Sequence, residues 1–429
     1  MSAIEEIQES VNRLYKFRDE YLKIYGIEEA GNKPQRMQEE IDKTVQEIED
    51  KKDEVNPNQR SELFLLHGRA LNASAEYNKS AEDMLGRATR FNLPEAWNEL
   101  GECLYKKGDF TGALTCFQKA LKLAQNKVYF RNISMLMRSL PWNTMADREE
   151  NVTKGLEYAR QALQLDMSDG HSWLVLGNAY LAAFFTVDSK LESLKNCKAA
   201  YIKAACDPLA VVLPELHFSK FHVEWYEEDY TAALSSLHRA YELEPTWEEC
   251  QTKFEECHKF LVKLANMVRT KGQLNQRRLN SLMAEINMNQ LGPYEKAGTN
   301  LTGGVKPDLV PVELLAEGTN HNKIILGKVI CTVIPESGIP FSLCIVDRDG
   351  GCVGVTVYNW ASGRGVKIGD SVAIVAPVLK SHSVSVPGHE SLSFRSVRVA
   401  LPLMLVVNKR PVGVSQVATS QIVSQQKPE

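Results

Sequence analysis

The sequence predicts a mainly α-helical chain that ends in an all-β domain. Two observations support this fold class. Up to residue 289, apolar residues recur with the spacing of amphipathic helices. From Lys323 onward, short runs rich in Val, Ile and Phe are separated by Gly, Pro, Asp and Asn, as in successive β-strands. The 429 residues suffice for two or three domains.

Residues 1–58 are predicted to form an N-terminal helical segment of two amphipathic helices. Two apolar stripes with helical spacing are separated by a break at Gly31–Pro34. The second stripe ends before Pro57, which cannot continue a helix. The stripes are Ile4, Ile7, Val11 and Leu14, and then Met37, Ile41, Val45 and Ile48.

Residues 59–246 are predicted to hold about five tetratricopeptide (TPR) repeats of about 34 residues each. Each repeat is a pair of antiparallel helices, in which large residues fill the space between helices and small residues let them approach. In the second clear repeat, Gly177 and Cys197 are 20 residues apart. The repeat pattern places these two positions about 12 residues apart. We therefore expect an insertion around residues 184–192. The three clearest repeats contain Trp97, Leu100, Gly101, Ala113, Phe117 and Ala120; Trp173, Leu176, Gly177 and Tyr180; and Ala233, Leu237, Ala240 and Pro245.

The C-terminal third of the chain divides into four predicted segments. Residues 247–289 read as helices that cap the open end of the repeat stack, and the Gly- and Pro-rich residues 290–319 read as a linker. Five predicted strands in residues 320–410 fit a small barrel of the oligonucleotide/oligosaccharide-binding (OB) type. These strands are expected at Ile324–Val333, Phe341–Val346, Cys352–Tyr358, Ser371–Val375 and Leu392–Val407. Residues 411–429, rich in Ser and Gln, are predicted to be a flexible tail.

Composition and motifs predict a binding protein and no enzyme. No catalytic constellation is present, and six of the nine histidines lie within predicted helices, where a structural role is the usual one. The nine cysteines are scattered without CxxC spacing, so neither a metal site nor a cofactor is predicted. No apolar run reaches the roughly 18 residues of a membrane span, and the acidic N-terminus does not resemble a signal peptide. We therefore expect the protein in the cytoplasm and the nucleus.

Charge is distributed unevenly along the chain. The net charge is −4, yet residues 320–410 hold ten Lys and Arg against five Asp and Glu. A basic barrel after an acidic body indicates different partners for the two halves, although the asymmetry could also serve solubility alone. Four aromatic residues of the barrel could stack on the bases of DNA or RNA. They are Phe341, Tyr358, Trp360 and Phe394, and the alternative is that they belong to the core.

The concave groove of a repeat stack is formed by the first helix of each pair, and peptides bind there. On this basis Asn98, Arg138, Asn178 and Glu215 are candidate peptide-binding residues, with a solvated helix face as the alternative. Because Asn98 stands where the clamp of chaperone-tail receptors has Lys, such a receptor is disfavoured. A second candidate site is the basic cluster Lys271, Arg277 and Arg278, which could contact phosphates of ribosomal RNA or be an ordinary helix end.

Several motifs together resemble the tetratricopeptide repeat protein 5 (Strap) family. They are Trp97–Glu102, Lys106–Asp109, Ser172–Asn178, Gly369–Ile374 and Ser396–Val399. The resemblance runs in order from about Val11 to Val407, so it covers nearly the whole chain. The repeats alone are unspecific, but repeats joined to this barrel are much more specific.

The resemblance implies two roles. One is to recognise the N-terminus of nascent tubulin at the ribosome, which triggers decay of tubulin mRNA. For this role it implies that Arg138 meets an acidic residue of the peptide, while Glu215 and Glu249 meet its arginine. Family members have Asp at the first of these acidic positions, so Glu215 is a conservative departure.

The other implied role is that of a nuclear transcription cofactor in the stress and DNA-damage response. Its partners would be transcription coactivators that include a histone acetyltransferase. The barrel would then contact chromatin or DNA.

Overall fold

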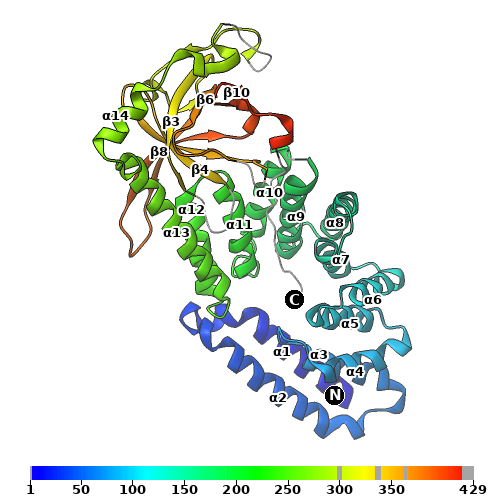
Figure 1. Cartoon of the computed structure of the whole chain (residues 1–429). Coiled ribbons are helices and arrows are strands. Elements are labelled where there is room, and N and C mark those ends of the chain that lie inside the picture. The colour runs from blue at the N-terminus through cyan, green and yellow to red at the C-terminus, as the bar shows by residue number, and fades with distance from the viewer. Residues whose placement is uncertain (1, 189, 297–301, 334–339, 362–364, 418–429) are drawn as a thin grey trace. The chain divides into compact units, whose positions relative to one another are not determined.

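A computed structural model describes residues 2–188, 190–296, 302–333, 340–361 and 365–417 (Figure 1). These residues form two compact units. One consists of residues 2–223 with 238–248, and the other of residues 224–237 with 249–417. Among the described residues, no helix combines the length and the apolar content that crossing a bilayer requires.

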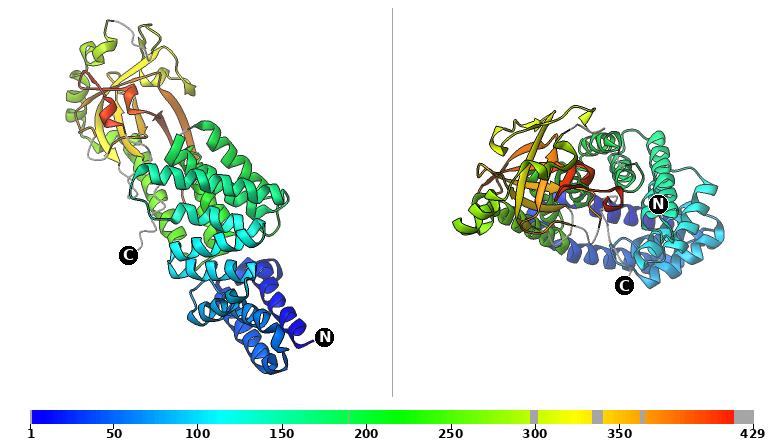
Figure 2. Two further views of the ribbon diagram at one scale, coloured as in Figure 1. Left: turned by 90° about the vertical axis from the view of Figure 1, so that its right-hand side faces the viewer. Right: turned by 45° about the horizontal axis from the view of Figure 1, so that its top comes forward.

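The predicted repeat solenoid is confirmed, because successive antiparallel helix pairs follow an N-terminal hairpin (Figures 1 and 2). The hairpin is α1 (Ala3–Tyr25) and α2 (Lys33–Lys51). The pairs are α3 (Arg60–Leu71) with α4 (Lys79–Ala88), α5 (Pro94–Lys107) with α6 (Phe110–Leu123), α7 (Lys127–Ser139) with α8 (Met145–Leu165), α9 (Gly170–Ala183) with α10 (Leu191–Ala204), and α11 (Pro214–Tyr226) with α12 (Tyr230–Leu243).

Within each pair, the repeat glycines stand where helices touch. A β-carbon added to Gly101 of α5 would lie 2.5 Å from the ring of Phe117 in α6. One added to Gly177 of α9 would lie 2.4 Å from the ring of Tyr201 in α10. Since real β-carbons do not approach so closely, these positions require glycine.

The insertion expected around residues 184–192 begins with a π-helical turn, Phe184–Asp188, in which the adjacent rings of Phe184 and Phe185 are buried.

The N-terminal hairpin contacts both ends of the repeat stack in its unit. Its apolar stripe packs on Leu66 and Ala70 of α3. At the far end of α1, Tyr21 and Leu22 share a core cluster with Leu243 of α12. The first and the last helix of this unit therefore contact each other, which closes the row of helices.

The second unit contains a curled β-sheet whose strand order is that of an OB barrel. In the order β10-β9-β6-β3-β4-β5-β8-β7-β2, neighbours are hydrogen-bonded, and β1 pairs with β3. Strands β5 and β8 are parallel, as the third and fifth strands of an OB barrel are. The main strands are β3 (Lys323–Val333), β4 (Phe341–Val346), β5 (Cys352–Val357), β6 (Ser371–Val375), β7 (Val378–Val384) and β8 (Leu392–Val399). The short ones are β1 (Asp308–Leu309), β2 (Gly318–Thr319), β9 (Leu405–Val407) and β10 (Arg410–Pro411).

The described residues contain more strands than the five predicted. The strand expected at Ser371–Val375 continues as β7 after a bend at Ala376, which has a positive φ of 45°. Its first part pairs with β3 and its second part with β8, so the bend closes the barrel. The last predicted run divides into β8 and β9. Sequence reasoning missed β7 because the polar residues Lys380–Ser383 interrupt the apolar pattern.

Segments outside the predicted barrel contribute to its core. Val312 and Leu315, in the expected linker, are buried in the main core cluster together with Val412 of the expected tail. Helix α13 (Glu248–Arg269) and α14 (Gln276–Ala284) follow the repeats. Residues 249–269 belong to the barrel's compact unit, where Leu264 lies against Gly354 of β5. That these helices cap the repeat stack stays a prediction.

Candidate functional site

Arg138 in α7 carries a half-buried guanidinium that has no carboxylate partner among the described residues. Its Nη1 donates a hydrogen bond to the carbonyl oxygen of Ser134, at 3.2 Å. Burial lowers the pKa of this guanidinium, while the nearby Tyr201 and Tyr105 hydroxyls act in the opposite direction. The group stays charged. A desolvated cation without a counter-ion costs free energy, so an anionic group of a ligand would be held strongly here.

Asn178 in α9 lies in the same part of the groove as Arg138, because both are linked to Tyr201 of α10. The Tyr201 hydroxyl donates a hydrogen bond to Asn178 Oδ1 at 2.7 Å, and the charge of Arg138 acts on the same hydroxyl. The amide group of Asn178 is half-buried, and its nitrogen donates no hydrogen bond that the structure describes. An arginine and a free amide donor side by side can bind a carboxylate.

Asn98 in α5 is held in a polar network, with 4% of its surface exposed. Its Nδ2 donates to Glu102 Oε1 at 2.9 Å, and its Oδ1 accepts from Asn132 Nδ2 of α7, also at 2.9 Å. Asn132 donates to Glu102 as well, at 2.8 Å. Both polar ends of the Asn98 side chain are therefore engaged. The less buried Glu102 and Asn132 are better placed for a ligand.

Sequence reasoning missed a buried carboxylate, Glu99, which lies next to this network. Glu99 forms an ion pair with Arg69 of α3 at 3.3 Å, and the Tyr15 hydroxyl of α1 donates to it at 3.3 Å. Burial, and then the charge of Glu102, raise the pKa of Glu99 to about 7. These partners lie far apart in the sequence, so only the stacking of the repeats reveals the cluster. Glutamate on an otherwise apolar face was the one available signal.

These side chains lie on first helices of successive pairs, which are neighbours. Helix α3 contacts α5, α5 contacts α7, and α7 contacts α9. They form two groups. In one, Glu102 and Asn132 are hydrogen-bonded to Asn98, and in the other, Asn178 is hydrogen-bonded to Tyr201, whose hydroxyl is also affected by the charge of Arg138. Of the predicted site residues, the structure thus brings Arg138 and Asn178 together, while Asn98 belongs to the network between α5 and α7.

The two predicted acidic residues lie elsewhere. Glu215 is in the first turn of α11, with its side chain exposed on one side. Burial raises the pKa of its carboxyl, while a backbone hydrogen bond and the charge of Lys33 in α2 act in the opposite direction. Glu249 is exposed in the first turn of α13 and belongs to the other compact unit.

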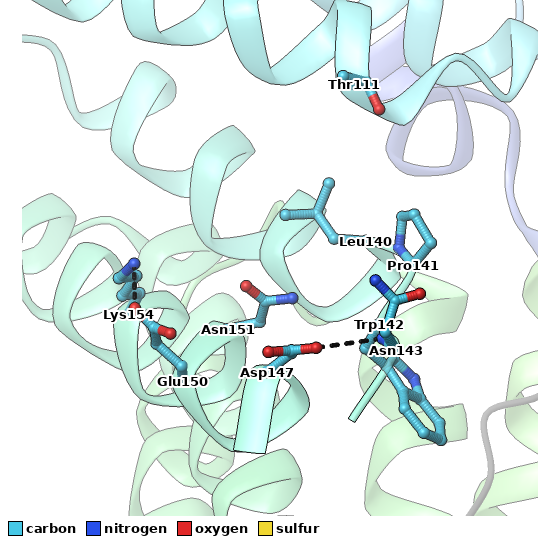
Figure 3. A pocket seen from close by; sticks show the side chains of 9 residues that line it. All are labelled: Thr111, Leu140, Pro141, Trp142, Asn143, Asp147, Glu150, Asn151 and Lys154. Carbon is cyan, nitrogen blue, oxygen red and sulfur yellow. Dashed lines mark hydrogen bonds and ion pairs between the residues drawn. The ribbon is translucent and has the colours of Figure 1, made fainter. Parts of the chain in front are cut away.

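A pocket of about 420 Å³ lies at the loop between α7 and α8, where Trp142 is exposed (Figure 3). Two of its acidic side chains already have partners. Asp147 accepts hydrogen bonds from backbone N–H groups of the loop, and Glu150 forms an ion pair with Lys154 at 2.6 Å. None of the predicted site residues lines this pocket.

Comparison with known proteins identifies the relatives of this chain. A family model described as "Tetratricopeptide repeat protein 5 OB fold domain" matches residues 306–421, and one described as "Tetratricopeptide repeat" matches residues 94–127. The chain is 37% identical over 426 residues to "Tetratricopeptide repeat protein 5" of Homo sapiens, which covers 98% of this chain and 96% of the human protein. The chain belongs to the tetratricopeptide repeat protein 5 family. The family member of Bos taurus is 36% identical with the same coverage.

This result confirms the resemblance inferred from the sequence motifs. The alignment with a solved TPR protein of Thermus thermophilus covers 46% of this chain and 98% of the Thermus chain, with 17% identity and a TM-score of 0.39. Membership in the tetratricopeptide repeat protein 5 family, together with the repeat fold, supports a protein-binding adaptor with peptide or protein partners.

The predicted basic cluster lies in the barrel's compact unit. Arg277 and Arg278 are exposed in the first turn of α14, and Lys271 lies in the preceding turn, close to Gly350 of the β4–β5 hairpin. None of the three has an acidic partner among the described residues. Cations at a helix N-terminus are electrostatically unfavourable, so an external anion would stabilise Arg277 and Arg278.

The four aromatic residues and four of the ten basic residues of the barrel are engaged in contacts within this compact unit. Tyr358 and Phe394 are buried, while Phe341 and Trp360 are partly buried and contact each other, with ring centroids 5.7 Å apart. Four basic side chains of the barrel form ion pairs with carboxylates from flanking segments, which reduces the charge available to a nucleic acid. These pairs are Lys328–Glu285, Lys380–Glu228, Arg395–Glu313 and Arg398–Glu228. In the described ranges, no group of three or more His, Cys, Asp or Glu side chains is arranged as a metal site.

Proposed function

We propose that this chain is a non-enzymatic adaptor that binds the N-terminus of nascent tubulin in its repeat groove, at the ribosome, and so triggers decay of tubulin mRNA. The observation that carries the proposal is the half-buried guanidinium of Arg138, which lies beside Asn178 and Tyr201 without a carboxylate of its own. Such a site suits an acidic side chain of an extended peptide.

The acidic residue Glu215 supports the second half of this proposal. It lies in the first turn of α11, where burial raises the pKa of its carboxyl, and a cation close to it would favour the ionised form. An arginine of the bound peptide would supply that cation. Glu249 is the other proposed partner of the peptide's arginine, and its role follows from the family alone.

Isothermal titration calorimetry with a synthetic tubulin N-terminal peptide tests the proposal. Arg138→Ala should weaken binding by about tenfold or more, because a charge-assisted hydrogen bond is lost. Arg160→Ala is the matched control, since Arg160 lies on the second helix α8 and contacts the Tyr180 hydroxyl at 3.3 Å. If Arg138→Ala, Arg160→Ala and the wild type bind the peptide with equal affinity and melt at the same temperature, Arg138 is not part of the binding site.

Binding to the ribosome is a separate part of the proposal, and it assigns Lys271, Arg277 and Arg278 to contacts with ribosomal RNA. This role places the protein in the cytoplasm. The nuclear alternative is a transcription cofactor that assembles histone acetyltransferase complexes while its barrel contacts chromatin or DNA. The ion pairing of the barrel's basic residues weighs against this alternative.

A further inference from the structure

One outer face of the barrel carries a row of polar and aromatic side chains on strands β5, β8 and β7. Thr356 of β5 lies opposite Arg398 of β8, while Ser396 and Phe394 of β8 lie opposite Lys380 and His382 of β7. Their neighbours in the strands, such as Val355 and Val397, point into the core, so this row points outward. OB barrels usually bind nucleic acid on the face that includes the third strand, which is β5 here.

A carboxylate from the α11–α12 turn occupies this face. The turn lies in residues 224–237, which belong to the same compact unit as the barrel. Glu228 Oε1 is 3.1 Å from Arg398 Nη1 and accepts a hydrogen bond from the Tyr358 hydroxyl at 3.0 Å. Glu228 Oε2 is 3.4 Å from Lys380 Nζ. The Glu228 side chain is 0% exposed, whereas the side chains of Arg398 and Lys380 keep 14% and 32% of their surface exposed.

Aromatic contacts extend this arrangement on both sides of Glu228. The Arg398 guanidinium lies 3.9 Å from the ring centroid of Tyr358 and 4.7 Å from that of Tyr226. Tyr230 stacks on Phe394, with an interplanar angle of 26° and centroids 6.3 Å apart. Sites for single-stranded nucleic acid likewise combine cations for the phosphates with aromatic rings for the bases.

The backbone of the turn is adapted to this position. Glu228 has a φ of 61°, a left-handed conformation that is unfavourable for a residue with a side chain. Arg398 also donates to the backbone carbonyl of Tyr226 at 2.7 Å, and the Thr231 hydroxyl donates to the carbonyl of Ser383 at 3.2 Å. Backbone strain at Glu228 is thus offset by several contacts with the barrel.

We infer that the outer face of β5, β8 and β7 is a closed site whose ligand is the chain's own α11–α12 turn. Glu228 stands where a phosphate would bind, and Tyr230 stands where a base would stack. Single-stranded nucleic acid is therefore excluded from this face in the folded chain. Any contact of the barrel with DNA or RNA has to use another surface.

Two measurements on the full chain test this inference. The first is fluorescence anisotropy of a labelled single-stranded oligothymidine of about 20 nucleotides at low salt. Because Glu228 already pairs with both cations, Lys380→Gln and Arg398→Gln should leave the affinity within about twofold of wild type. Lys380 is the partly exposed member of the pair, so its variant remains informative if Arg398→Gln does not fold.

The second measurement is a thermal double-variant cycle with Glu228→Gln and Arg398→Gln. If the turn is the ligand, each single variant should lower the melting temperature by about 5–15 °C, and the double variant should melt no lower than the worse single variant. Additive losses would overturn the inference. A folded Lys380→Gln or Arg398→Gln protein that binds the oligonucleotide more than about threefold more weakly than wild type would also overturn it.

Discussion

The hydroxyl of Tyr201 donates a hydrogen bond to the side-chain oxygen of Asn178 over 2.7 Å and so joins the two helices of one repeat inside the groove. The Tyr201 ring packs directly on Gly177, so a side chain at residue 177 would displace the ring. Tyr201, which packs between the helices of its repeat, therefore also orients the side-chain amide of Asn178, a candidate ligand-binding group next to Arg138.

Tyr201→Phe should weaken binding of the tubulin peptide by about three- to tenfold, less than Arg138→Ala, because the amide of Asn178 loses its orientation but no charge is lost. Unfolding free energy should fall by about 1 kcal/mol, the usual contribution of one neutral hydrogen bond. Calorimetry and urea denaturation measure the two effects. Tyr180→Phe on the same repeat is the control, and an equal loss of affinity in both variants would contradict the specific role of Tyr201.

Gly101→Ala should destabilise the helical unit by about 2 kcal/mol, because the added carbon would lie 2.5 Å from the Phe117 ring and force it to move. Gly86→Ala in α4 is the matched control. A β-carbon there meets no other atom within 4 Å, so the change should be neutral or stabilising by up to about 1 kcal/mol. Urea denaturation compares the two variants, and a similar loss in both would refute the packing argument.

The repeat helices could be predicted from the sequence because their spacing carries the information. Gly101 packs on Phe117, and Gly177 packs on Tyr201 in the same way, so pattern alone places these residues on helices. The pairing of Glu99 with Arg69 and Tyr15 could not be predicted, since it depends on how successive helices stack. Asn98 was predicted as a ligand-binding residue from its face, but its side chain is engaged by Glu102 and Asn132.

The barrel shows a similar division. Runs rich in Val, Ile and Phe predict β3 to β6, but β7 was missed because its outward residues include Lys380 and His382. Lys380 and His382 contact the α11–α12 turn. This turn lies far from β7 in the sequence, so the contact could not be predicted from the pattern of residues. The expected linker contributes Val312 and Leu315 to the core, which its Gly and Pro content did not indicate.

Stability of the helical unit should depend on the protonation of Glu99. Its folded-state pKa is raised from 4.5 to about 7, mainly by burial. The folded chain therefore binds this proton more tightly than the unfolded chain, so its contribution to stability is full below pH 4.5 and is lost as pH rises to about 7. Half-buried histidines such as His171, whose pKa is lowered by partial burial, act in the opposite direction.

The variant Glu99→Gln isolates this contribution, because the amide keeps hydrogen-bonding ability but does not titrate in this range. Unfolding free energies from urea titrations between about pH 5 and pH 8 should show a wild-type curve that falls relative to the variant as pH rises. Parallel curves for the two proteins would show that Glu99 titrates normally.

Reversal of charge at the start of α14 should weaken binding to ribosomes. Arg277 and Arg278 are exposed and lack acidic partners among the described residues, so changing both to Glu removes two cations without breaking an ion pair. Acidic residues also suit a helix N-terminus, so the fold should be as stable as before or slightly more stable.

Co-sedimentation with purified ribosomes over a series of salt concentrations measures this effect. The double variant should bind at least about tenfold more weakly at low salt, with a smaller dependence on salt, as expected when phosphate contacts are lost. The matched control reverses Lys409 and Arg410, an equally exposed basic pair at β10. If the control loses binding to the same extent, general electrostatic attraction rather than the α14 cluster holds the ribosome. If neither variant loses binding, the cluster has no part in it.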